Sequence, residues 1–178
     1  MHFLIDSDLK EISFIKDIIK EKINGEPRLF VSIANQCKEL HKFRLIKKIP
    51  NTVYILSALD RNNKELWYRG EYQRNSIYIY IDPKNNLETE ESLRWIFFHE
   101  LAHQIIAHCK QIERRVYSRE RKLIIDRLLR GKRATMNRVK LIHDLLPEEF
   151  IADFFATMVV GRSYDAEWFE KVEKKTRR

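Results

Sequence analysis

Residues 95–108 read WIFFHELAHQIIAH, and this stretch decides how the rest of the chain must be arranged. Apolar residues recur at spacings of three and four and also cover the remaining sides, which is typical of a helix buried inside a protein. Two histidines and a glutamate are costly in such a helix unless they are hydrogen-bonded or coordinate an ion. The stretch therefore predicts a central helix that carries a polar site.

His99, Glu100 and His103 form the pattern H-E-x-x-H. Side chains four residues apart lie on one face of a helix, so the two imidazoles are close enough to share a metal ion. Glu100 lies at the edge of that face, where its carboxylate can take a proton from a metal-activated water. Imidazoles suit zinc, and a catalytic zinc keeps one position open for water. We therefore expect one zinc ion per chain, with Glu100 as the general base; the alternative is a core helix whose polar residues are merely hydrogen-bonded.

A catalytic zinc has three protein ligands, and the histidine-rich solution to the third ligand fails in this chain. The pattern H-E-x-x-H-x-x-G-x-x-H would require glycine and histidine where the sequence has Ile106 and Cys109. His108 follows His103 by five residues and so points away from the face that carries the two histidines. The third ligand must therefore come from another segment.

A predicted helix that begins at Pro147 and ends near Val160 offers such a ligand. Glu149 and Asp153 are four residues apart and share a face of this helix. We predict that Glu149 binds the metal while Asp153 accepts a hydrogen bond from a ligating histidine and so fixes its tautomer. Glu148 and His143 remain alternatives for the third ligand.

The remaining pattern predicts a mainly helical α+β domain, a single domain over residues 1–178. Alternating apolar and polar residues predict strands at 52–57, 65–69 and 76–81, joined as an antiparallel three-stranded meander with a bend at Gly70. We expect this sheet to pack on the H-E-x-x-H helix. Further helices are predicted from a cap at Asp6 or Ser7 to about Ile23, from Pro27 to about Phe43, and from about Asp165 to Lys174.

The positive charge of the chain is concentrated in one predicted helical insertion at about residues 109–143. Twelve Lys or Arg and three Asp or Glu give this segment a net charge of +9, against +8 for the whole chain. The segment is open to three interpretations: it binds nucleic acid through phosphate contacts, it attracts a substrate, or it is a solvated face. The sequence offers no span long enough for a membrane and no signal peptide, and Cys37 and Cys109 lack disulfide spacing, so we expect a cytoplasmic protein.

The strand at 76–81, H-E-L-A-H on a buried helix, and a second helix reading E-x-x-A-D-x-F-A together resemble the ImmA/IrrE family of zinc metallopeptidases, over about residues 76–161. The resemblance implies a gluzincin-like, zincin-like domain in which His99, His103 and Glu149 bind zinc, Glu100 is the base and Asp153 supports a ligand. It also implies a peptidase that acts on an intracellular regulatory protein such as a helix-turn-helix repressor. This chain has Ala102 where the family often has glycine, and its basic segment lengthens the gap between the two motifs.

The expected function is a zinc-dependent endopeptidase that hydrolyses a peptide bond with a metal-activated water. The strand at 76–81 would hold an extended substrate by adding it to the sheet edge. Tyr80, His143 and Tyr164 are candidates for the group that stabilises the oxyanion. The alternatives are a nucleic-acid-associated zincin, in which residues 109–143 dock on DNA or RNA, and a non-catalytic metal-containing binding protein with a closed site.

Overall fold

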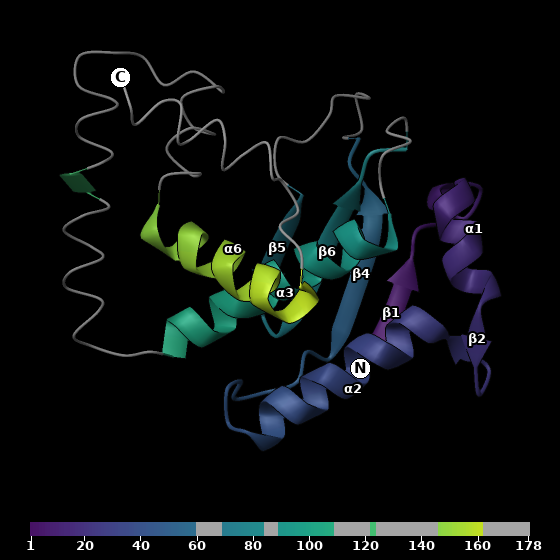
Figure 1. Cartoon of the computed structure of the whole chain (residues 1–178). Helices are drawn as coiled ribbons and strands as arrows, with labels where there is room; N and C mark the ends of the chain where they lie inside the picture. Colours follow the sequence, from purple (N-terminus) through teal and green to yellow (C-terminus); the bar gives the residue numbers. More distant parts are fainter. Residues whose placement is uncertain (60–68, 84–88, 109–121, 124–145, 162–178) are drawn as a thin grey trace, which may run out of the picture.

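The computed structural model describes residues 1–59, 69–83, 89–108, 122–123 and 146–161. Within these residues the chain is α+β, as predicted, with a sheet behind the helices in Figure 1. The elements are β1 (His2–Ile5), the 3-10 helix η1 (Ser7–Leu9), α1 (Ser13–Lys20), β2 (Lys22–Ile23), β3 (Glu26–Pro27), α2 (Arg28–Lys42), β4 (Thr52–Ser57), β5 (Gly70–Gln73), β6 (Ser76–Ile81), α3 (Glu90–His108) and α6 (Pro147–Val160).

The main sheet has four strands in the order β1-β4-β6-β5, so the predicted three-stranded antiparallel meander was wrong. β4 runs parallel to both of its neighbours: Thr52 is paired with His2 on one side and with Ser76 on the other. Among the strands that the structure describes in this sheet, β5 and β6 form the antiparallel pair. A strand's alternating pattern reports which face is buried but carries no information on its partner or direction, and this is why the prediction failed.

The hairpin between β5 and β6 turns at Arg74 and Asn75, whose φ angles are 48° and 64°. Positive φ at both central residues defines a type I′ turn, which matches the twist of the flanking strands. β5 begins at Gly70. The predicted strand at 65–69 lies almost wholly outside the described residues. Gly70 is a strand residue and not the predicted bend.

The N-terminal segment differs from the single helix predicted up to Ile23. Residues 2–5 form β1 at the edge of the sheet, and Asp6 then accepts a hydrogen bond from the backbone N–H of Asp8 to start η1. α1 is only eight residues long and is followed by the small hairpin of β2 and β3, which turns at Asn24 and Gly25. The prediction of α2 was correct, with Pro27 immediately before its first residue.

The core lies between the sheet and the central helix α3. β4 and β6 present Val53, Ile55, Ile77, Ile79 and Ile81 on one face, and all five side chains are fully buried. α3 packs against β5 and β6 on one side and against α6 on another, and its residues Phe97, Phe98 and Leu101 have no exposed surface. The predicted buried central helix is thus confirmed.

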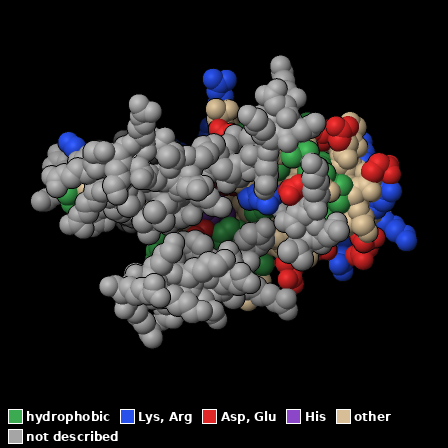
Figure 2. Space-filling model, turned by 90° about the horizontal axis from the view of Figure 1, so that it is seen from above, with side chains coloured by type: hydrophobic (Ala, Val, Ile, Leu, Met, Phe, Trp, Pro, Cys, Tyr) green, Lys and Arg blue, Asp and Glu red, His purple; other side chains and the backbone are tan. Residues whose placement is uncertain are grey.

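Charged side chains of both signs are interspersed on the described surface around α1, at the right of Figure 2. Two of the ion pairs there join Lys16 to Glu11 at 2.7 Å and Arg28 to Glu21 at 2.9 Å, all on exposed side chains. The basic insertion predicted at 109–143 lies outside the described residues apart from 122–123, which are helical and exposed. The helix predicted at 165–174 also lies outside them. None of the described helices is long and apolar enough to cross a membrane.

Candidate metal centre

The beginning of α3 is fixed by a pair of reciprocal hydrogen bonds. The Ser92 backbone N–H donates to Thr89 Oγ1 at 3.2 Å, and the Thr89 backbone N–H donates to Ser92 Oγ at 2.8 Å. This is the geometry of a capping box, with serine in place of the usual glutamate. Glu90 and Glu91 add negative charge to the first turn, where the helix dipole favours it. These contacts set the register of the helix that carries the H-E-x-x-H residues.

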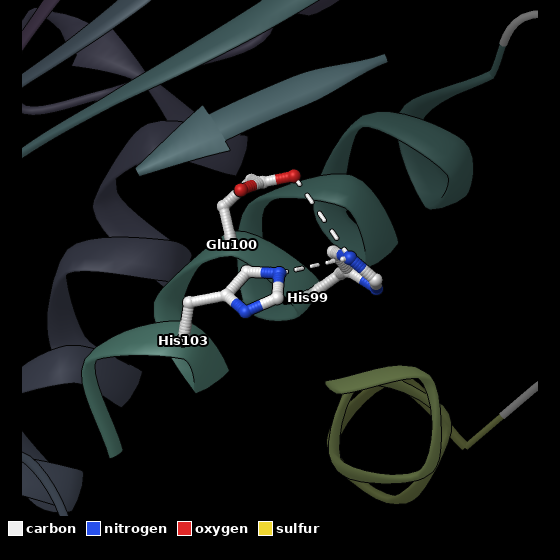
Figure 3. Close-up of side chains that lie close together, drawn as sticks. All are labelled: His99, Glu100 and His103. Atoms are coloured by element: carbon white, nitrogen blue, oxygen red, sulfur yellow. Dashed lines mark hydrogen bonds and ion pairs between the residues drawn. The ribbon is translucent and has the colours of Figure 1, made fainter. Parts of the chain in front are cut away.

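His99 and His103 project from the same side of α3, one turn apart (Figure 3). Their Nε2 atoms are 3.3 Å apart. The carboxylate of Glu100 is buried, and its Oε1 lies 4.0 Å from His99 Nε2. One ligand atom from each of the three residues lies within 4.8 Å of the others, and this group could hold a metal ion.

α6 brings two more carboxylates to the two histidines. Pro147 is its first residue, so Glu149 lies in the first turn and Asp153 one turn later on the same face. Glu149 Oε2 is 3.2 Å from His99 Nε2 and 3.5 Å from His103 Nε2, and the residue is buried. Asp153 Oδ1 lies 2.8 Å from His99 Nδ1. The structure therefore brings Glu149 and Asp153 beside the histidines of α3, as the sequence spacing predicts.

Of the two alternatives for the third ligand, the structure describes Glu148 but not His143. Glu148 precedes Glu149 by one residue and is rotated by about 100° from the helix face that carries Asp153. His143 lies outside the described residues. The register of α6 thus favours Glu149 as the carboxylate that faces His99 and His103.

Three of these atoms have the spacing of ligands around a single small ion. His99 Nε2, His103 Nε2 and Glu149 Oε2 form a triangle with edges of 3.2, 3.3 and 3.5 Å. Ligands bound tetrahedrally at about 2.0–2.1 Å lie about 3.3–3.4 Å apart, because the edge of a tetrahedron is about 1.6 times its centre-to-corner distance. The three donor atoms therefore have the spacing of three corners of a tetrahedral metal site.

The ring of His99 is held on both of its nitrogens. Burial by itself lowers the pKa of His99, but the hydrogen bonds with Asp153 and Glu149 and the charges of Glu100 and Asp153 outweigh it and raise the pKa to about 10. An ionised carboxylate can only accept, so two ionised carboxylates favour the form of His99 in which both ring nitrogens carry a proton. A metal would replace the proton on Nε2 and leave the bond from Nδ1 to Asp153 in place.

The contacts of Trp95 at this site could not be predicted from the sequence. The Trp95 ring stacks on the His99 ring with their centroids 5.3 Å apart, and Trp95 Nε1 donates to Thr157 Oγ1 at 3.3 Å. Trp95 therefore joins α3 to α6 beside His99. Its indole was predicted only as an apolar residue of the helix, since nothing in the spacing identifies Thr157 as its partner.

Two predicted roles for β6 require correction. β6 lies between β4 and β5, so both of its edges are paired and it cannot accept an added peptide strand. Its core face carries Ile77, Ile79 and Ile81, so strand alternation places Tyr80 on the opposite face, away from α3. Tyr80 is thereby removed as an oxyanion donor. The other two candidates, His143 and Tyr164, lie outside the described residues.

The chain matches no protein-family model, and neither a curated protein nor a solved structure is significantly similar to it. Its H-E-x-x-H residues lie on a buried helix and form a group that could hold a metal ion. Any finer assignment must therefore be argued from the site itself.

Proposed function

We propose that this chain is a zinc-dependent endopeptidase. The observation that carries the proposal is the triangle of donor atoms on His99, His103 and Glu149, whose edges lie between 3.2 and 3.5 Å. Two imidazoles, one carboxylate and one open position make up a ligand set found in catalytic zinc sites, whereas a structural zinc is closed by four protein ligands.

Glu100 is the general base in this proposal. When bound, the zinc would polarise the carbonyl of a peptide bond and lower the pKa of the attacking water. Glu100 takes the proton from that water and passes it to the leaving amine. Its Oε1 is 4.0 Å from His99 Nε2, a distance longer than any edge of the ligand triangle, which supports a role beside the three ligands for this carboxylate.

Asp153 and Trp95 hold the first histidine in the orientation that the reaction needs. Asp153 accepts the proton of His99 Nδ1 at 2.8 Å, which leaves Nε2 to face the metal position. The stacked ring of Trp95 limits rotation of the imidazole. Such supporting contacts orient the ligand and raise its basicity, and their loss typically weakens metal binding by about 10- to 100-fold.

The proposed substrate is an extended peptide bound along β5, which, in the part of the chain that the structure describes, is the edge strand of the sheet beside α3. The Tyr80 backbone N–H donates to the carbonyl of Arg69 at 2.8 Å, and Gly70 is paired with Ile79. Bonded and non-bonded pairs alternate in an antiparallel ladder, so Gly70 turns its N–H and C=O to the outer edge. A peptide strand added there needs only backbone hydrogen bonds and would pass directly beside Glu100.

The order of motifs supports membership of an ImmA/IrrE-type, zincin-like peptidase group. H-E-L-A-H on α3 and E-x-x-A-D-x-F-A on α6 contribute residues to one site, with the spacing that metal binding requires. This assignment makes an intracellular regulatory protein, such as a helix-turn-helix repressor, the proposed substrate class.

The test compares Glu100→Gln with Glu91→Gln, an isosteric change at an exposed position on the same helix. Both variants should hold about one zinc per chain, since neither removes a proposed ligand. Glu91→Gln should cleave unstructured peptides like the wild type, whereas Glu100→Gln should be slower by about 10²- to 10⁴-fold because the base is lost. Zinc is measured by mass spectrometry of the metal, and cleavage by mass spectrometry of a peptide library.

Equal cleavage by the wild type and Glu100→Gln would count against the proposal, as would a wild-type protein that holds no zinc.

A further inference from the structure

β5 and α3 are in contact through two pairs of residues, Gly70 with Glu100 and Tyr72 with Gln104. Gly70 and Tyr72 lie two residues apart on the face of β5 that packs on α3, and Glu100 and Gln104 lie one helical turn apart on α3. At the second point, Gln104 Nε2 donates to the Tyr72 hydroxyl at 3.0 Å. At the first point, the backbone of Gly70 packs directly against the side chain of Glu100.

The contact at Gly70 leaves no room for any side chain. A Cβ atom on Gly70 would come within 2.6 Å of Glu100 Cγ and 2.7 Å of Glu100 Cδ, and it would also overlap Oε1. Separations below 3.0 Å are essentially never found for a real Cβ, and the conflict involves most of the Glu100 side chain and not only its flexible end. Gly70 is therefore required here for its size.

Glu100 cannot easily move aside to relieve such a conflict. The residue is only 6% exposed, and it lies on the side of α3 that faces a strand of the sheet (Figure 3). Its Oε1 is already 4.0 Å from His99 Nε2, so a shift of the carboxylate away from β5 changes its distance to the donor atoms of the site. The Tyr72–Gln104 hydrogen bond keeps β5 from retreating.

We propose that Gly70 is a positioning residue for Glu100: by having no side chain, it fixes where the carboxylate lies relative to His99, His103 and Glu149. The packing part of this inference concerns the fold alone. Its catalytic consequence rests on the proposed function, in which Glu100 is the base. Gly70 would then position both the Glu100 carboxylate and the substrate. Its outward N–H and C=O are the groups to which a peptide bound along β5 would form hydrogen bonds.

The packing is tested by a thermal double-mutant cycle with Gly70→Ala, Glu100→Ala and the double variant. Gly70→Ala should lower the Tm by roughly 2–8 °C in the presence of Glu100, and by nothing measurable once position 100 is alanine, because the conflicting atoms are then gone. The Glu100→Ala background thus serves as the matched control for the general effect of alanine in a strand. Additive shifts in Tm would overturn the inference.

The positioning role is tested by kinetics with the zinc-loaded proteins. Gly70→Ala should keep its zinc, because no proposed ligand is changed, and should lower kcat by at least about tenfold, since efficient proton transfer needs the base in place. In the Glu100→Ala background the same substitution should have no further effect on kcat. A Gly70→Ala protein with wild-type kcat would overturn the positioning role.

The two proposals can fail separately. A wild type without peptidase activity would refute the endopeptidase, while non-additive shifts in Tm would still support the contact between Gly70 and Glu100.

Discussion

At the scale of single residues, the centre of the site is the His99 ring, which is held from three directions. Asp153 accepts from Nδ1 at 2.8 Å, Trp95 stacks on the ring, and Nε2 is left facing His103 and Glu149. Each of these groups comes from α3 or α6, two helices that pack on each other. A site built on helices in this way would hold its donor atoms close to the geometry that a metal ion needs.

The first prediction concerns the ligand from α6 and uses Glu149→Gln with Glu148→Gln as its control. Both changes remove one acid from the first turn, so their effect through the helix dipole is the same. Only Glu149→Gln should lose zinc or bind it much more weakly, because the carboxylate that lies 3.2 Å from His99 Nε2 becomes a poor amide ligand. Zinc per chain after gel filtration provides the measurement. Loss of zinc from Glu148→Gln alone would place the ligand one residue earlier on α6.

At the scale of secondary-structure elements, α3 is joined to the sheet and to a loop through Gln104. This side chain is 2% exposed; its Oε1 accepts from the Lys48 backbone N–H at 3.3 Å, and its Nε2 donates to the Tyr72 hydroxyl. The Tyr72 hydroxyl in turn donates to Asn75 Oδ1 at 3.4 Å, within the hairpin turn. One buried amide therefore ties together the helix that carries the site and the strand at the sheet edge.

The second prediction follows from this buried amide. Gln104→Leu should destabilise the protein by about 1–3 kcal/mol, because it leaves the Lys48 N–H without its acceptor and the Tyr72 hydroxyl without its donor. Gln73→Leu, the same change at an exposed position on β5, should stay within about 0.5 kcal/mol of the wild type. Urea unfolding of the three proteins measures the difference. A Gln104→Leu protein as stable as Gln73→Leu would show that the two hydrogen bonds contribute nothing net.

The elements also show which features a sequence can predict. The helix of His99 and the helix of Glu149 were predicted because spacings of three and four residues report directly on one helix face. The sheet order was not, since β1, β4 and β6 are brought together by pairings between residues far apart in the chain. The packing of Gly70 on Glu100 was missed for the same reason: it depends on which strand lies at the edge beside α3.

At the scale of the whole molecule, charge is distributed unevenly along the chain. Residues 109–143 carry a net charge of +9, which leaves the remainder at −1, and the described surface around α1 mixes both signs (Figure 2). In the sequence, the segment lies between the end of α3 at His108 and the start of α6 at Pro147, the two helices that supply His103 and Glu149. A cation-rich segment attached there would raise the local concentration of an acidic partner near the site.

The last prediction tests whether this charge serves catalysis, and it assumes the proposed peptidase activity. Two peptides share one cleavage sequence, flanked by glutamates in the first and by serines in the second. Reversal of Arg114, Arg115, Arg119 and Lys122 to Glu should lower kcat/KM for the acidic peptide and hardly change it for the neutral one, since no proposed ligand is altered. Raised salt should have the same effect on the wild type, because the Debye length falls from about 10 Å at 0.1 M to about 3 Å at 1 M. The measurement is kcat/KM against salt for both proteins and both peptides, with zinc content as the control. If wild type and variant give the same salt profile on the acidic peptide, the segment does not recruit substrate by charge.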